Sequence, residues 1–165
     1  MPAPASPLGP AQIALIARGV STIVASRDAC HRPSLMRAVG SAINPAGDEI
    51  TAYLGRTAAA QLLADLAATG RVAVVFSQPS TNLALQVKAG RVRLRPAEAG
   101  DTPVLQRYLQ SMEHELGQLG FGPQQVRTFL AYRLDDLAAV QFTPEQAFDQ
   151  TPGRAAGSAL CGTQP

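Results

Sequence analysis

The chain has 165 residues, of which 46% are hydrophobic and 16% charged, a composition typical of one folded domain rather than of a disordered segment. The 14 lysines and arginines nearly balance 12 acidic residues, and the resulting net charge of +2 gives no support to nucleic-acid binding. The two cysteines and two histidines form no zinc-binding pattern, and no apolar run has the length of a membrane span or signal peptide, which favours a cytoplasmic protein without a metal or a membrane partner.

The N-terminal segment, residues 1–19, is expected to be an arm followed by a short helix. Residues 1–10 contain four prolines among small residues, which favours a loose arm. Residues 12–18 are mostly apolar and precede Gly19, which is positioned to end a helix.

Three strands are predicted in the next part of the chain, at residues 20–27, 34–43 and 49–54. The first is rich in β-branched side chains. In the second, Leu35, Arg37 and Val39 are expected to share one face, because strand side chains alternate. The Asn-Pro-Ala-Gly-Asp sequence at residues 44–48 is a strong turn signal, so the second and third strands should form a hairpin.

A helix at residues 57–69 and strands at residues 72–76 and 83–95 are predicted in the middle of the chain. The helix has an apolar stripe of leucines and alanines and is followed by Gly70. In the second strand, apolar residues occupy odd positions before Ala89 and even positions after Gly90. We therefore predict a β-bulge at Ala89 and Gly90, which favours a curled, barrel-like sheet.

The second half is predicted to contain two helices, a strand and a tail. Asp101, Thr102 and Pro103 form a good helix start, and a shorter helix should follow Pro123. Residues 138–143 have strand character. Runs of neighbouring strands favour an antiparallel α+β fold with peripheral helices.

Two arginines are candidates for binding an anion. Thr57 is expected to cap the helix at residues 57–69, and Arg56 beside it would add charge to a helix start that suits a phosphate. A capped helix preceded by a solvated arginine explains the same residues. Arg37, flanked by apolar neighbours on its face, either protects an edge strand or pairs with an anion.

Polar residues on the next two strands are further candidates. Ser77 begins a hydroxyl- and amide-rich loop, residues 77–82, that suits a polar ligand or an ordinary connection. Gln86 and Lys88 face away from their apolar neighbours and would also suit the solvated face of a half-buried strand. Arg91, Arg93 and Arg95 alternate along the strand, as expected either for phosphate contacts or for a charged sheet edge.

Most motifs of enzyme active sites are missing. The chain has no nucleophile elbow, no glycine-rich dinucleotide motif and no phosphate-binding P-loop. Glu113, His114 and Glu115 lie in a predicted helix whose buried stripe includes Met112 and Leu116, so we expect this triplet to face solvent.

The order of hairpin, helix, apolar strand and LALQVKAG segment resembles the FMN-binding split β-barrel proteins of the pyridoxamine-phosphate-oxidase-like family, from about residue 20 to 95. The segment AAVQFTPEQAFDQTPG resembles a C-terminal pattern of small members of that family. The resemblance implies an antiparallel split β-barrel at residues 20–150, with a helical insertion at about 101–132 and a flexible tail at 151–165.

The resemblance also implies a homodimer that holds FMN at its interface and acts as an oxidoreductase on an unidentified small substrate. The expected cofactor-binding residues are Arg37, Arg56, Thr57, Ser77, Gln86 and Lys88. Ala58 and Ala59 stand where family members that bind FMN well have a basic pair, and the C-terminal signature of the vitamin B6 oxidase is missing. The alternatives are a cofactor-free dimeric barrel that binds another ligand or a protein, and a nucleic-acid module that uses the three alternating arginines.

Overall fold

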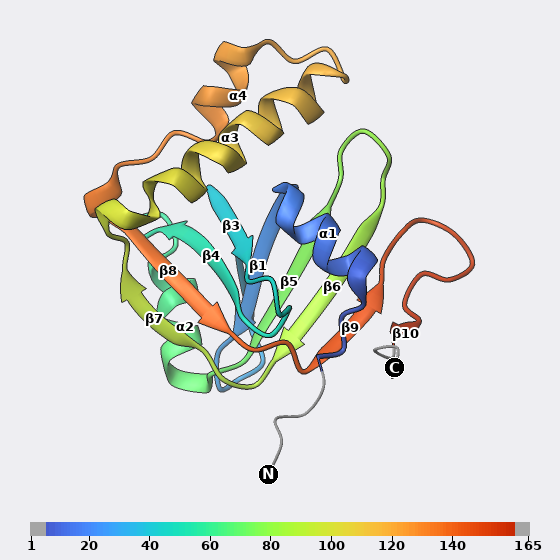
Figure 1. Cartoon of the computed structure of the whole chain (residues 1–165). Helices are drawn as coiled ribbons and strands as arrows, with labels where there is room; N and C mark the ends of the chain where they lie inside the picture. Colours follow the sequence, from blue (N-terminus) through green and yellow to red (C-terminus); the bar gives the residue numbers. More distant parts are fainter. Residues whose placement is uncertain (1–5, 161–165) are drawn as a thin grey trace.

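The computed structural model describes residues 6–160 and contains two antiparallel β-sheets with helices around them (Figure 1). The six-stranded sheet has, in spatial order, β10 (Ala159–Leu160), β9 (Gln146–Asp149), β6 (Ala84–Ala89), β5 (Val72–Ser77), β1 (Ser21–Arg27) and β2 (Pro33–Arg37). The four-stranded sheet has β3 (Gly40–Ile43), β4 (Ile50–Gly55), β8 (Leu137–Phe142) and β7 (Arg93–Pro96). This arrangement confirms the expected antiparallel α+β class.

One hydrophobic core fills the space between the two sheets. Alternate side chains of β1, β5 and β6 enter it, including Val24, Phe76 and Val87, and β4 and β8 supply Leu54 and Val140. The helices are α1 (Pro10–Arg18), α2 (Ala60–Thr69), α3 (Thr102–Gly117) and α4 (Pro123–Phe129), with short 3-10 turns η1 (Ala99–Asp101) and η2 (Leu134–Asp136). Helices α1 and α2 bury apolar side chains in this core, whereas α3 and α4 lie across one end of the barrel (Figure 1).

The single strand predicted at residues 34–43 is wrong, because the chain changes sheets in its middle. The Ala38 amide donates to Thr22 of β1, and the amide of the next residue, Val39, donates to Tyr53 of β4, each over 2.9 Å. Ala38 is fully buried at this step. Leu35 and Val39 therefore do not share a face, since Leu35 is exposed and Val39 packs against a second apolar cluster that includes Tyr53 and Leu105.

The bulged strand predicted at residues 83–95 is also wrong. Strand β6 ends at Ala89 in one sheet and β7 begins at Arg93 in the other, so the shift in the apolar pattern marks a second change of sheet. Gly90 lies close to Gly70, where a β-carbon would come within 2.8 Å of the Gly90 carbonyl oxygen. Gly70 also has a φ of +68°, so glycine is required there both for space and for backbone conformation.

The helices predicted after residue 101 and the strand after residue 138 are present, and two further strands follow them. Strand β9 pairs with β6, and the two-residue strand β10 pairs with β9. Both strands are too short to show a clear alternation in the sequence. The tail predicted from residue 151 thus carries part of the sheet, while residues 161–165 lie outside the described residues.

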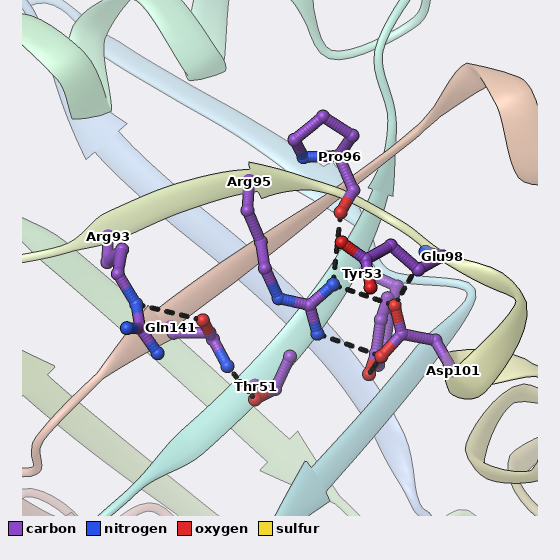
Figure 2. A network of polar contacts seen from close by, with 8 residues as sticks. All are labelled: Thr51, Tyr53, Arg93, Arg95, Pro96, Glu98, Asp101 and Gln141. Carbon is purple, nitrogen blue, oxygen red and sulfur yellow. Dashed lines mark hydrogen bonds and ion pairs between the residues drawn. The ribbon is translucent and has the colours of Figure 1, made fainter.

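A network of polar contacts fixes the start of α3 to the four-stranded sheet (Figure 2). The Arg95 guanidinium donates to both Asp101 carboxylate oxygens, over 2.7 and 2.8 Å. The Tyr53 hydroxyl and the Glu98 amide donate to the same carboxylate, each over 2.8 Å. The hydrogen bond and charge of Arg95 lower the pKa of Asp101 well below its usual range. Burial of the Tyr53 hydroxyl, together with its hydrogen bond to the Asp101 carboxylate, raises the pKa of Tyr53 to about 12.

Candidate functional site

One face of the six-stranded sheet points away from the core, and we call it the outer face. Side chains of β1, β5 and β6 alternate between buried positions and half-exposed or exposed positions on this face. The outward side chains include six large or small apolar ones, Ile23, Ala25, Leu35, Ala73, Val75 and Phe148, among polar and charged neighbours. Leu35 is 63% exposed. A solvent-exposed apolar surface of this kind suits a ligand or a second protein chain.

Four of the six predicted site residues lie on the outer face. In the strand register, Arg37 is opposite Ile23, Ile23 is opposite Val75, and Val75 is opposite Gln86. Arg37 and Gln86 are thus three strand spacings apart, about 14 Å, in one row across the sheet. Lys88 is in the neighbouring row opposite Ala73, and Ser77 is opposite Ser21 at the end of β5.

At one end of the outer face, a cavity of about 520 Å³ lies between the sheet and the α3–α4 pair. We call it the hairpin pocket, after the helical hairpin of α3 and α4. It is lined by Ser21, Arg37, Ser77, Pro79, Met112, Leu116, Phe121, Phe129 and Leu130. The Arg37 guanidinium donates to the Ser21 hydroxyl over 2.9 Å. Within residues 6–160, no carboxylate lies within ion-pair distance of Arg37. The pocket therefore combines one uncompensated cation with apolar walls.

At the opposite end of β1 and β5, an open groove of about 440 Å³ carries three cationic side chains, Arg27, Arg71 and Lys88. We call it the basic groove. Glu145 lines it as well, and the Lys88 ammonium lies 4.9 Å from the centre of the Phe148 ring. The excess of positive charge suits a phosphate. Arg27 and Arg71 were not among the predicted residues, because their sequence context is that of ordinary solvated arginines at a strand end and after a helix.

Arg56 and Thr57 lie elsewhere, and Thr57 is not the cap of α2. The helix begins at Ala60, with Ala59 as its cap residue, and Thr57 belongs to the preceding turn. The Thr57 hydroxyl and amide donate to the Asp136 carboxylate over 2.7 and 3.2 Å. The Arg56 amide donates to the Asp136 carbonyl oxygen.

These contacts place an acid of the chain itself at the position expected for a phosphate. A phosphate bound to Thr57 would have to displace the Asp136 carboxylate or accept its negative charge at close range. Ala58 and Ala59 supply no cation to offset that repulsion. The residues at the start of α2 therefore do not fit the phosphate of FMN.

The predicted polar loop at residues 77–82 is held by the protein at Gln78 and Ser80, whereas Ser77 and Pro79 line the hairpin pocket. Glu115 is 3% exposed, which corrects the expectation that it faces solvent. Its carboxylate accepts hydrogen bonds from the Gln78 side chain and the Ser80 amide, over 2.9 and 3.1 Å. Burial raises the pKa of Glu115, but these hydrogen bonds outweigh it, so the pKa is lowered overall. No group of three potential metal ligands occurs within the described part of the chain.

Two of the three alternating arginines make contacts within the protein. Arg95 pairs with Asp101, and Arg93 donates to Gln141 (Figure 2). The Arg93 guanidinium also lies 3.8 Å from the Glu49 carboxylate. Neither guanidinium is free to follow a row of phosphates without giving up these partners.

Comparison with known proteins identifies the fold. No known family model matches the chain, and no curated protein matches its sequence. Its structure is similar to that of an F420 reductase, with a TM-score of 0.56, 14% identity and coverage of 81% of this chain and 93% of the other. A putative pyridoxamine 5'-phosphate oxidase from Lactobacillus delbrueckii gives a TM-score of 0.54, 13% identity and coverage of 86% and 93%.

A third similar structure, HupZ from Group A Streptococcus, gives a TM-score of 0.53, 12% identity and coverage of 88% of this chain and 95% of the other. Likeness at these identities identifies the architecture and leaves the activity to be argued from the residues. The split β-barrel that the sequence resemblance implied is thus confirmed as the fold. None of the helices within residues 6–160 is long and apolar enough to cross a membrane.

Proposed function

From the split-barrel fold that the chain shares with these structures, we propose that it binds FMN or a related flavin-type cofactor on the outer face and acts as an oxidoreductase. A second copy of the chain would cover the other side of the cofactor. The observation that carries the proposal is the gathering of Arg37, Ser77, Gln86 and Lys88 on one face, around the apolar side chains of Ile23 and Val75.

Each part of the outer face has a role in this proposal. Ile23 and Val75 form an apolar floor for a flat aromatic ring system, and the Gln86 amide beside them offers both a donor and an acceptor to its polar edge. Lys88, Arg71 and Arg27 hold the phosphate in the basic groove instead of at Thr57. A bound flavin itself supplies the redox chemistry, so the protein needs only to bind, orient and shield it.

A fluorescence titration tests the proposal. Flavin emission should be quenched as FMN binds, and Lys88→Gln should weaken FMN binding about tenfold while leaving the binding of phosphate-free riboflavin nearly unchanged. Thr57→Ala should leave FMN affinity as it is, because the phosphate does not use Thr57. An exposed arginine in the C-terminal part of the chain, Arg154, provides the matched control Arg154→Gln. Absence of quenching with the unmodified protein would rule the proposal out.

The second candidate is a cofactor-free dimeric barrel, and the contact between Thr57 and Asp136 favours it. In this case the outer face serves mainly as the contact between two copies. Leu35→Glu should then convert a dimer into monomers in light scattering, while FMN causes no change in flavin fluorescence with either protein. A dimer that also quenches FMN supports the first candidate instead.

A further inference from the structure

The hairpin pocket differs from the rest of the outer face in being enclosed by a second element. The floor comes from the ends of β1, β2 and β5, and α3, α4 and the loop between them form the wall. Its volume of about 520 Å³ falls within the range of small-molecule sites, about 300–1,000 Å³. Two chemical properties of its lining restrict what it can bind.

The first property is an uncompensated positive charge. The described contacts of the Arg37 side chain consist of one hydrogen bond to a neutral hydroxyl, that of Ser21. A guanidinium has five donors in a planar fork and pairs best with a carboxylate or a similar anion. Ser21 at the start of β1 and Ser77 at the end of β5 face each other in the sheet and line the same pocket, so their hydroxyls offer further donors to an anion.

The second property is an aromatic and aliphatic wall. Phe121 and Phe129 pack edge to face with ring centres 6.1 Å apart, yet they remain 40% and 56% exposed. Met112 and Leu116 of α3 continue this surface into the pocket. An apolar ligand that covers large exposed side chains around a cavity removes their apolar surface from water, which favours binding.

A buried hydroxyl lies on α3, the helix that supplies Met112 and Leu116 to the pocket. Tyr108 lies one helical turn before Met112, is 1% exposed and has no hydrogen-bond partner for its hydroxyl among the described residues. Burial raises its pKa, while the polar groups of Thr22 and the charge of Arg37 lower it.

From these observations we propose that the hairpin pocket binds an amphipathic monoanion, a carboxylate on an aromatic or alkyl body. The carboxylate pairs with Arg37, and the body lies against Phe121 and Phe129. The ligand acts as substrate only if the proposed flavin function holds, since the pocket adjoins the apolar floor at Arg37. Binding by itself requires no flavin.

Calorimetric titration of the flavin-free protein tests this binding. The probes are 2-naphthoate and decanoate, which distinguish an aromatic from an alkyl body, and uncharged 2-naphthamide serves as control. We expect either carboxylate to bind at least tenfold more tightly than the amide, because only the carboxylate forms an ion pair with Arg37. Arg37→Gln should remove that preference, and Phe129→Ala should weaken both naphthyl probes alike. Arg154→Gln should change none of these values.

The possible results separate this inference from the proposed function. If the protein binds the carboxylates but never binds FMN, the inference about the hairpin pocket is supported and only the proposed flavin function is wrong. Three results would overturn the pocket: no binding of either carboxylate, equal affinity for acid and amide, or an unchanged preference in Arg37→Gln. A Phe129→Ala variant that turns a dimer into monomers, without carboxylate binding by the parent protein, would instead identify the pocket wall as a contact between copies.

Discussion

The start of α2 and the hairpin pocket have similar side chains but different surroundings. Each offers an arginine and one or two hydroxyls, residue types suited to an anion. At α2, Asp136 arrives from a distant segment and takes the donors of Thr57, whereas Arg37 in the pocket has a serine hydroxyl in place of an acid. A carboxylate from a distant segment therefore decides whether such polar groups hold the fold together or remain available to a ligand.

The largest expected effect concerns Asp101, the most fully paired acid of the described chain. Asp101→Ala should lower the free energy of unfolding by about 3 kcal/mol, because Arg95 and Tyr53 would lose a shared, mostly buried partner. Urea unfolding followed by circular dichroism measures this change. Arg37→Gln should stay within about 0.5 kcal/mol of the parent protein. Equal losses in the two variants would contradict the distinction between paired and available arginines.

The same contacts should make stability depend on pH. Asp101 has a folded-state pKa below its unfolded value, so its contribution is present above pH ~4 and is lost as the pH falls toward the folded value. The pKa of Tyr53 is raised to about 12, so its contribution is present below pH ~10 and is lost as the pH rises through 12. Unfolding curves from pH 2 to 6 should show an acid-side decline. Asp101→Asn should flatten this decline, and an unchanged slope in that variant would argue against the role of Asp101.

A smaller effect is expected at the start of α2. Asp136→Asn should cost about 1 kcal/mol, because the Thr57 donors would lose a charged acceptor. Removal of the acid should also let an external anion use those donors. Thermal unfolding with added sulfate should therefore stabilise Asp136→Asn more than the parent protein.

Asp135→Asn, one residue away and exposed, controls for loss of charge in the same turn. If sulfate stabilises Asp135→Asn as much as Asp136→Asn, the effect does not arise at Thr57.

The apolar patterns of the sequence were sufficient to predict most elements but not their assignment to sheets. The leucine stripe of α2 and the helix start at Asp101 both predicted real helices, since helical periodicity is a local signal. The change from odd to even apolar positions near Ala89 is real, but it marks a change of sheet and not a β-bulge. The local pattern shows only that the buried face of the chain switches. The long-range pairing of β7 with β8 shows that the chain has entered the other sheet.

The candidate site was predictable to a similar degree. Alternation in single strands, the polar loop at residues 77–82 and family resemblance together predicted Arg37, Ser77, Gln86 and Lys88, which lie on one face. Phe121 and Phe129 were missed as site residues because they lie just before the start and at the end of the short helix α4, where exposed aromatic residues give no periodic signal. Asp136 was missed because its effect on Thr57 arises across 79 residues of sequence.

The change of sheet at Ala38 places Arg37 next to the point where the chain passes from one sheet to the other. Arg37 is the last residue of β2, and within two residues the backbone is hydrogen-bonded to the opposite sheet at Tyr53. Tyr53 in turn donates to Asp101 at the start of α3, the helix that forms a wall above Arg37. A short covalent and hydrogen-bonded path, from Arg37 through Val39 and Tyr53 to Asp101, thus joins the residue that would bind the ligand's anion to the helix that forms the wall of its pocket.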